Sequence, residues 1–121
     1  RKIIWKNYHS LFEKFENPFF LNRPSIPSDC NHNGHIYYVL VKKEERNQII
    51  HKMLEKNIQV TSHYVPLHSS KAGKKYSQTS GDLKNTINCA ASIIRLPIWI
   101  GLEYEQQEYI VESFEKVLKS L

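Results

Sequence analysis

The sequence has little cysteine, little glycine and no long hydrophobic run. No apolar stretch approaches the roughly 20 residues of a membrane-spanning helix, so we expect no transmembrane segment and no membrane partner. The first residues contain neither the hydrophobic core nor the cleavage site of a signal peptide. The two cysteines, Cys30 and Cys89, are far apart in the sequence. We therefore expect reduced thiols in a cytoplasmic protein.

Motifs of a self-contained catalyst are also absent. The Gly73-Lys74 pair has no glycine five residues earlier and no Ser or Thr after the lysine, so it is no phosphate-binding P-loop. Ser69 and Ser70 have no evident orienting group or oxyanion site, which a nucleophilic pair with histidine would need. We assign no catalytic residue to this chain.

Six histidines raise the question of a metal site. Cys30, His32 and His35 have a plausible ligand spacing, and His63 with His68 could complete a set of four. Structural zinc sites usually show two compact ligand pairs, whereas this group is loose. His63 and His68 straddle a proline and do not form the i, i+4 pair of a metalloprotease helix. We predict no metal.

Length and charge indicate one domain with a basic surface. A chain of 121 residues can bury a core without disulfides. It lacks an initiator methionine and begins inside an amphipathic pattern, so we expect a piece of a longer protein. The formal charge of +5 leaves open a free-standing α/β module that binds nucleic acid or another anionic ligand. The positive residues are scattered, apart from Lys71, Lys74 and Lys75.

Hydrophobic spacing predicts the elements of the first half. Residues 4–15 repeat apolar side chains at helical intervals, and Asn17-Pro18 is expected to end this helix. Residues 19–33 form an ordered connector. Residues 35–41 are a continuous apolar run, typical of a strand buried on both faces. The helix that follows places Leu54 among its inward residues, and Asn57 suits a left-handed helix end.

The second half continues this alternation. Residues 57–65 alternate like a strand, with Ile58, Val60, Ser62 and Tyr64 on one face. Residues 69–81 are expected to form a mobile loop that can include one short helical turn. Asp82 can cap a helix, after which residues 93–99 become extended. The closing helix carries an apolar stripe from Ile110 to Leu121. Together these elements predict an α/β (α+β) fold, a two-layer sandwich whose helices pack mainly on one face of a small sheet.

The end of the predicted strand at 57–65 is the best candidate for a site. There His63 and Tyr64 would lie on opposite faces, one toward the core and one toward a cleft, with His68 and a basic loop beside it. This arrangement suits a domain that completes an active site for an anionic ligand. The alternative, with Tyr64 in the core and His63 at a sheet edge, stays open.

Several motifs resemble one enzyme family. They are His-Tyr-Val-Pro-Leu-His-Ser-Ser at 63–70, Arg-Leu-Pro-Ile-Trp-x-Gly-Leu at 95–102 and Glu-Gln-Gln at 105–107. The starting helix and Cys-x-His-Asn-x-His-x-Tyr-Tyr at 30–38 agree. The chain resembles the C-terminal segment of the DegT/DnrJ/EryC1/StrS sugar aminotransferases over essentially its whole length. Its details most resemble the branch that aminates dTDP-4-oxo-6-deoxy-D-glucose to dTDP-4-amino-4,6-dideoxygalactose for surface antigen synthesis.

The resemblance implies a small domain, residues 1–121, of a homodimeric enzyme that uses pyridoxal phosphate (PLP) and takes its amino group from glutamate. In that family the Schiff-base lysine lies in a preceding large domain, so the chain alone is expected to be inactive and to bind no cofactor. It would supply one wall of the nucleotide-sugar cleft. His63, Tyr64 and His68 are the expected substrate contacts, supported by Asn33 and His35.

A few positions carry open alternatives or depart from the family pattern. Arg95 could bind a carboxylate or form a structural ion pair. Glu103 stands where the family has a Ser or Thr cap, which is expected to weaken the last helix's cap. Asn57 replaces a usual glycine. Lys71 replaces a usual proline, which leaves the conformation of its loop in doubt.

Overall fold

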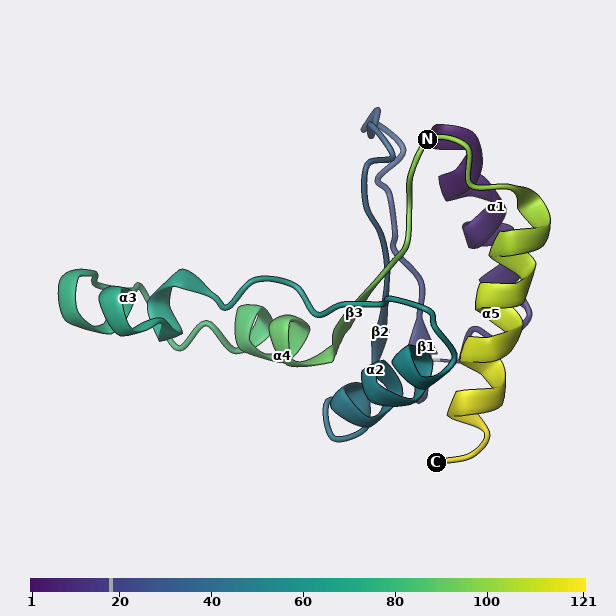
Figure 1. Ribbon diagram of the computed structural model, residues 1–121. Helices are drawn as coiled ribbons and strands as arrows, with labels where there is room; N and C mark the ends of the chain where they lie inside the picture. Colours follow the sequence, from purple (N-terminus) through teal and green to yellow (C-terminus); the bar gives the residue numbers. More distant parts are fainter. Residues whose placement is uncertain (18) are drawn as a thin grey trace.

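The structure is a computed structural model that describes residues 1–17 and 19–121 (Figure 1). Its elements, in chain order, are α1 (Lys2–Glu13), β1 (Leu21–Asn22), β2 (Tyr37–Val41), α2 (Arg46–Glu55), the 3-10 turn η1 (Leu67–Ser69), α3 (Lys71–Tyr76), α4 (Lys84–Ser92), β3 (Ile93–Leu96) and α5 (Tyr104–Leu118). This arrangement confirms the expected α+β fold. The expected helix stop at Asn17-Pro18 includes Pro18, which lies outside the described residues, and α1 ends earlier.

The sheet has three antiparallel strands in the order β1-β2-β3. Tyr38 of β2 pairs with Arg95 of β3, so the two residues lie on the same face. On the opposite face Tyr37, Val39 and Val41 are buried against the helices, whereas Tyr38 is only half-buried. The expectation that β2 is buried on both faces was therefore wrong, because α1, α2 and α5 cover one face.

The predicted strand at 57–65 does not form. Its first part is placed as expected, since Ile58 and Val60 are buried in the core. Thr61 then makes an isolated bridge with Arg95, with N···O distances of 3.1 and 2.7 Å. Beyond Thr61 no further bridge to the sheet forms within the described residues. The third strand is instead β1, whose two residues are too few to give a periodic signal.

An aromatic cluster ties α1 to the sheet and to α5. The Tyr8 and Tyr37 rings stack with centroids 5.2 Å apart, and the Phe12 and Phe114 rings meet edge to face at 5.6 Å. Tyr8 donates its hydroxyl to the Pro97 carbonyl at 2.9 Å. Burial raises the pKa of both tyrosines, so the hydroxyls stay protonated. The aromatic face of α1 thus has its partner inside this chain.

A buried glutamine also joins α1 to α5. Gln107 is fully buried, and its amide donates to the Ile4 carbonyl at 2.8 Å. Its side-chain oxygen accepts from the Asn7 amide at 3.0 Å. A buried amide is tolerated because both ends are hydrogen-bonded. The contact sets the position of α1 along α5.

The ends of the helices correct three expectations. Asn57 has the predicted left-handed conformation, with φ of 58°, but Leu54 faces solvent rather than the core. Glu103 does not weaken the start of α5, because its carboxylate accepts a backbone N–H in a capping box with Gln106. Leu121 is exposed, since α5 ends at Leu118.

Residues 62–92 form an arm that leaves the body of the domain and returns to it (Figure 1). The arm contains η1, α3 and α4, and none of its residues, all of which the structure describes, is buried. Because none of its residues is buried, the arm contributes little to the core.

Within the described part of the chain, no helix has the length and apolarity to cross a bilayer.

Candidate functional site

His63 and Tyr64 lie next to each other near the start of the arm. Their rings meet edge to face with centroids 5.1 Å apart. Both are exposed, and Tyr64 has 78% of its surface accessible. The expectation that one ring faces the core was wrong, because this segment is not a strand and its side chains do not alternate between two faces. The alternative that placed Tyr64 in the core was wrong for the same reason.

A shallow hollow of about 330 Å³ adjoins this ring pair. His63, Tyr64 and Pro66 form one side, while Cys89 and Ala90 of α4 form another. The free thiol of Cys89 is exposed. The hollow therefore combines an imidazole, a phenol and a thiol with an apolar lining. The sequence did not predict that Cys89 lies here, because residues 63–67 and α4 meet only when the arm folds back.

His68 lies apart from this hollow, on η1. It is half-buried, and its Nε2 atom is buried without a hydrogen-bond partner among the described residues. Its side chain is not part of the lining that His63 and Tyr64 share. The structure therefore brings together two of the three expected substrate contacts and leaves the third one turn further along the arm.

The turn at the tip of the arm is built by two serines and a glycine. Ser69 and Ser70 donate their hydroxyls to the carbonyls of Pro66 and Leu67, at 2.9 and 2.7 Å. Ser70 also caps α3 by accepting from the Gly73 N–H at 2.9 Å. A Cβ at Gly73 would overlap the Leu67 carbonyl oxygen. These contacts explain why the expected loop contains a defined helix.

Lys71, which replaces a proline that is usual in the family, fits its position in the structure. Lys71 is the first residue of α3, a position that tolerates proline because its N–H needs no partner within the helix. Lys71, Lys74 and Lys75 are all exposed, and no carboxylate of the described residues pairs with them. Residues 56–81 contain no Asp or Glu. The tip of the arm is therefore positively charged.

Asn33 and His35 form a local pair in the loop before β2. The Asn33 Oδ1 atom accepts the His35 backbone N–H at 3.2 Å and lies 2.7 Å from the His35 Nδ1 atom. Both residues are exposed, and neither lines the hollow beside His63. Within this chain the pair is separate from the arm.

Arg95 marks the base of the arm. Its backbone pairs with Thr61, at the point where the chain leaves the body. The Nε atom is buried without a hydrogen-bond partner, and no carboxylate of the described residues lies within ion-pair distance. The ion-pair alternative thus has no partner in the described chain, and carboxylate binding stays a prediction.

The described residues contain no group of three or more His, Cys, Asp or Glu side chains placed to hold a metal ion. They also contain no buried lysine. A Schiff-base lysine in a PLP enzyme is enclosed with its cofactor, so none of the described lysines is identified as one.

Comparison with known proteins identifies the family of this chain. A profile of the DegT/DnrJ/EryC1/StrS aminotransferase family matches residues 1–115. The chain belongs to this family. One curated relative, the dTDP-3-amino-3,6-dideoxy-alpha-D-galactopyranose transaminase of Aneurinibacillus thermoaerophilus, is 31% identical over 105 residues. The match covers 86% of this chain and 28% of that relative, so the chain spans less than a third of its length.

Solved structures of aminotransferases share the fold of this family member. DesV of S. venezuelae, in complex with a ketimine intermediate, superposes with a TM-score of 0.84 at 21% identity and covers 99% of this chain and 31% of DesV. NtdA of Bacillus subtilis, with bound cofactor PMP, gives a TM-score of 0.81 at 20% identity, over 98% of this chain and 28% of NtdA. At these identities the likeness concerns the fold, and it includes the arm.

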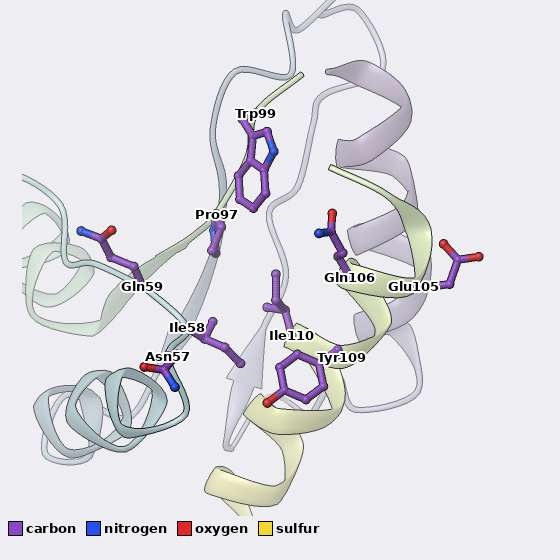
Figure 2. A pocket seen from close by; sticks show the side chains of 9 residues that line it. All are labelled: Asn57, Ile58, Gln59, Pro97, Trp99, Glu105, Gln106, Tyr109 and Ile110. Carbon is purple, nitrogen blue, oxygen red and sulfur yellow. The ribbon is translucent and has the colours of Figure 1, made fainter. Parts of the chain in front are cut away.

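A second cavity of this aminotransferase-family chain lies on the body, between α5 and the segments that follow α2 and β3 (Figure 2). Trp99 and Tyr109 line it, together with amide side chains. Trp99 belongs to the family motif at 95–102, whereas Tyr109 belongs to none of the motifs, and neither residue was expected to line a cavity. Trp99 was placed at the end of an extended segment, and no periodicity distinguishes an exposed tryptophan from a buried one.

Proposed function

We propose that the chain is the C-terminal small domain of a PLP-dependent aminotransferase. The intact enzyme transfers an amino group from glutamate to dTDP-4-oxo-6-deoxy-D-glucose. The product, dTDP-4-amino-4,6-dideoxygalactose, serves surface polysaccharide or antigen synthesis in the cytoplasm. Family membership supports the transamination. The name of the curated relative supports a dTDP-sugar, although that relative's product carries its amino group at position 3.

The observation that carries this proposal is the arm. It presents His63, Tyr64 and three lysines that pair with no carboxylate of the described residues, and it buries none of its own residues. An isolated domain gains little from such a segment, since exposed apolar surface and ordered backbone both cost free energy. The arm suits a role against another part of the enzyme, where its positive charge would offset a nucleotide pyrophosphate.

Each candidate residue has a proposed role. His63 and Tyr64 contact the nucleotide sugar or the amino donor from one wall of the cleft, and His68 contacts the same ligand from the next turn. Asn33 and His35 support the site through their local hydrogen bond. Arg95, which has no carboxylate partner among the described residues, is the candidate partner of a carboxylate such as that of glutamate.

The cofactor belongs to the intact enzyme. Family membership implies PLP there, and NtdA was solved with the aminated form of this cofactor. PLP provides the electron sink that transamination requires. We propose that the large domain supplies its lysine, that two copies of the enzyme form a homodimer, and that the 121-residue chain alone neither binds PLP nor transaminates. Nucleic acid and membranes are not proposed partners.

A histidine variant tests the proposed site. In the full-length enzyme, His63→Ala is expected to lower the rate of amination of dTDP-4-oxo-6-deoxy-D-glucose about tenfold or more, because a hydrogen-bonding group at the substrate is lost. The PLP absorbance should stay unchanged. Gln78→Ala, in the exposed part of the arm, is the matched control. Unchanged turnover in His63→Ala would show that the imidazole has no role in catalysis or binding.

The position of amination needs its own measurement. The purified enzyme, supplied with glutamate, is offered the 4-oxo and the 3-oxo 6-deoxy dTDP-sugars in parallel. We expect conversion of the 4-oxo sugar, and NMR of the product identifies the aminated carbon. Conversion of the 3-oxo sugar alone would move the protein to the activity for which its curated relative is named.

A further inference from the structure

None of the residues that line the cavity of Figure 2 has been given a role in the proposed aminotransferase function. Its volume of about 650 Å³ lies within the range of roughly 300–1,000 Å³ that is typical of small-molecule sites. Ile58, Pro97 and Ile110 form its apolar floor. We call this cavity the Trp99 groove.

Two aromatic side chains stand at the Trp99 groove with their faces open. Trp99 is 46% exposed and Tyr109 is 56% exposed. Neither ring stacks on another ring among the described residues. A large aromatic surface left in water is unfavourable, and a flat apolar face is the surface on which the C–H face of a pyranose ring packs. The pair therefore indicates a ligand with one flat apolar face.

Amide side chains form the polar part of the Trp99 groove. Asn57, Gln59 and Gln106 each carry both donors and an acceptor, which matches the dual nature of sugar hydroxyls. Gln106 is held in place, because its side-chain oxygen accepts the Glu103 backbone N–H at 3.0 Å. Its amide N–H groups have no acceptor among the described residues, so they are available to donate. Asn57 is fixed at the left-handed end of α2.

The charge of the lining selects against phosphates. Glu105 is the one charged residue among the described residues that line the groove, and no lysine or arginine is among them. In Figure 2 its carboxylate extends away from the space between Trp99 and Tyr109. An anionic ligand would meet no counter-charge here, whereas an uncharged polar ring would meet aromatic faces and amides.

We infer that the Trp99 groove binds the pyranose ring of an uncharged sugar. Trp99 and Tyr109 pack against the C–H face of the ring, while the amides of Asn57, Gln59 and Gln106 hydrogen-bond with its hydroxyls. This inference goes beyond the aminotransferase proposal and does not rest on it, because the site needs neither cofactor nor amino donor.

The test is a titration of the ¹⁵N-labelled protein with methyl glucopyranoside, methyl galactopyranoside and methyl fucopyranoside. We expect saturable shifts of the Trp99 indole N–H and of the Gln59 and Gln106 side-chain amides. Trp99→Ala and Tyr109→Ala should each weaken binding about fivefold to tenfold, the scale of a lost aromatic contact. Trp99→Phe, which keeps a flat ring, should retain most of the affinity.

Matched controls are available nearby. Ile100 is 83% exposed, adjoins Trp99 and does not line the groove, and Tyr104 lies on the same helix as Tyr109. Ile100→Ala and Tyr104→Ala should bind the sugars as the parent protein does. The inference is overturned if no hexoside gives saturable shifts, if Trp99→Ala in a folded variant binds equally well, or if thymidine or inorganic phosphate binds these amides more tightly than the sugars.

Discussion

At the scale of single residues, the Arg23 side chain joins α1 to the segment that follows β1. Its guanidinium is 13% exposed, pairs with Glu16 at 2.6 Å and donates to the His9 carbonyl at 2.6 Å. The Arg23 guanidinium holds the pKa of the Glu16 carboxyl below its usual range. Burial, followed by the charge of Arg23, lowers the pKa of His9, whose ring stacks on Trp5. The surroundings of His9 therefore favour the neutral form of its imidazole.

The lowered pKa of His9 predicts a loss of stability in mild acid. Because the folded pKa lies below the unfolded value, the unfolded chain binds more protons as the pH falls below about 6.5. Stability is therefore fully present above that pH and declines as the pH falls toward the folded pKa. Urea unfolding at pH 7.5 and 5.5 measures the decline.

His9→Gln should remove that part of the decline, because it removes the titrating ring. The control is His51→Gln on α2, where the imidazole is exposed beside Glu55. A decline of the same size in His9→Gln as in the parent protein would contradict the prediction.

At the scale of elements, the tip of the arm is held by its own short-range contacts, whereas α4 is also tied to the body, because the Arg46 guanidinium of α2 donates to the Ala90 carbonyl at 2.8 Å. The Ser70 cap and the close approach of Gly73 to the Leu67 carbonyl connect η1 to α3. The polar residues 69–81, with few apolar side chains and with Gly73 and Gly81 among them, predict a mobile loop from the sequence. The helix forms because a serine stands at the cap position and a glycine permits the tight turn.

Gly73→Ala tests this account of the arm. The added methyl group would overlap a carbonyl oxygen, so η1 and α3 should separate and the backbone resonances of residues 66–77 should shift. The unfolding free energy should fall by less than about 1 kcal/mol, because no residue of the arm, all of it described, is buried. In the full-length enzyme, amination should decrease. Ala72→Gly is the control at the adjacent exposed position, and a normal arm spectrum for Gly73→Ala would refute the steric argument.

At the scale of the whole molecule, the chain divides into a body with a core and an arm without one. The body packs α1, α2 and α5 on one face of the sheet, and the arm projects from the side (Figure 1). Local stability follows buried contacts, so the two parts should open with different free energies.

Hydrogen exchange measures that difference directly. We expect the amides of β2 and of the middle of α5 to exchange only through global unfolding, and those of α3 and α4 to exchange at least about 100-fold faster. In the full-length enzyme the arm should become protected, because the proposed cleft would cover it. Equal protection of arm and body in the isolated chain would contradict the division.

The amphipathic helices, the existence of strand β2 and the left-handed Asn57 follow from local patterns, because hydrophobic periodicity and capping chemistry act over a few residues. The family motif at residues 63–70 was equally visible in the sequence. Tertiary structure alone decided that this motif lies on an arm instead of in a strand, since a strand needs a neighbour and the chain leaves the sheet after Thr61. It also decided that Cys89 and His63 line one hollow and that Trp99 and Tyr109 line one groove with Ile58, because these segments meet only through contacts distant in sequence.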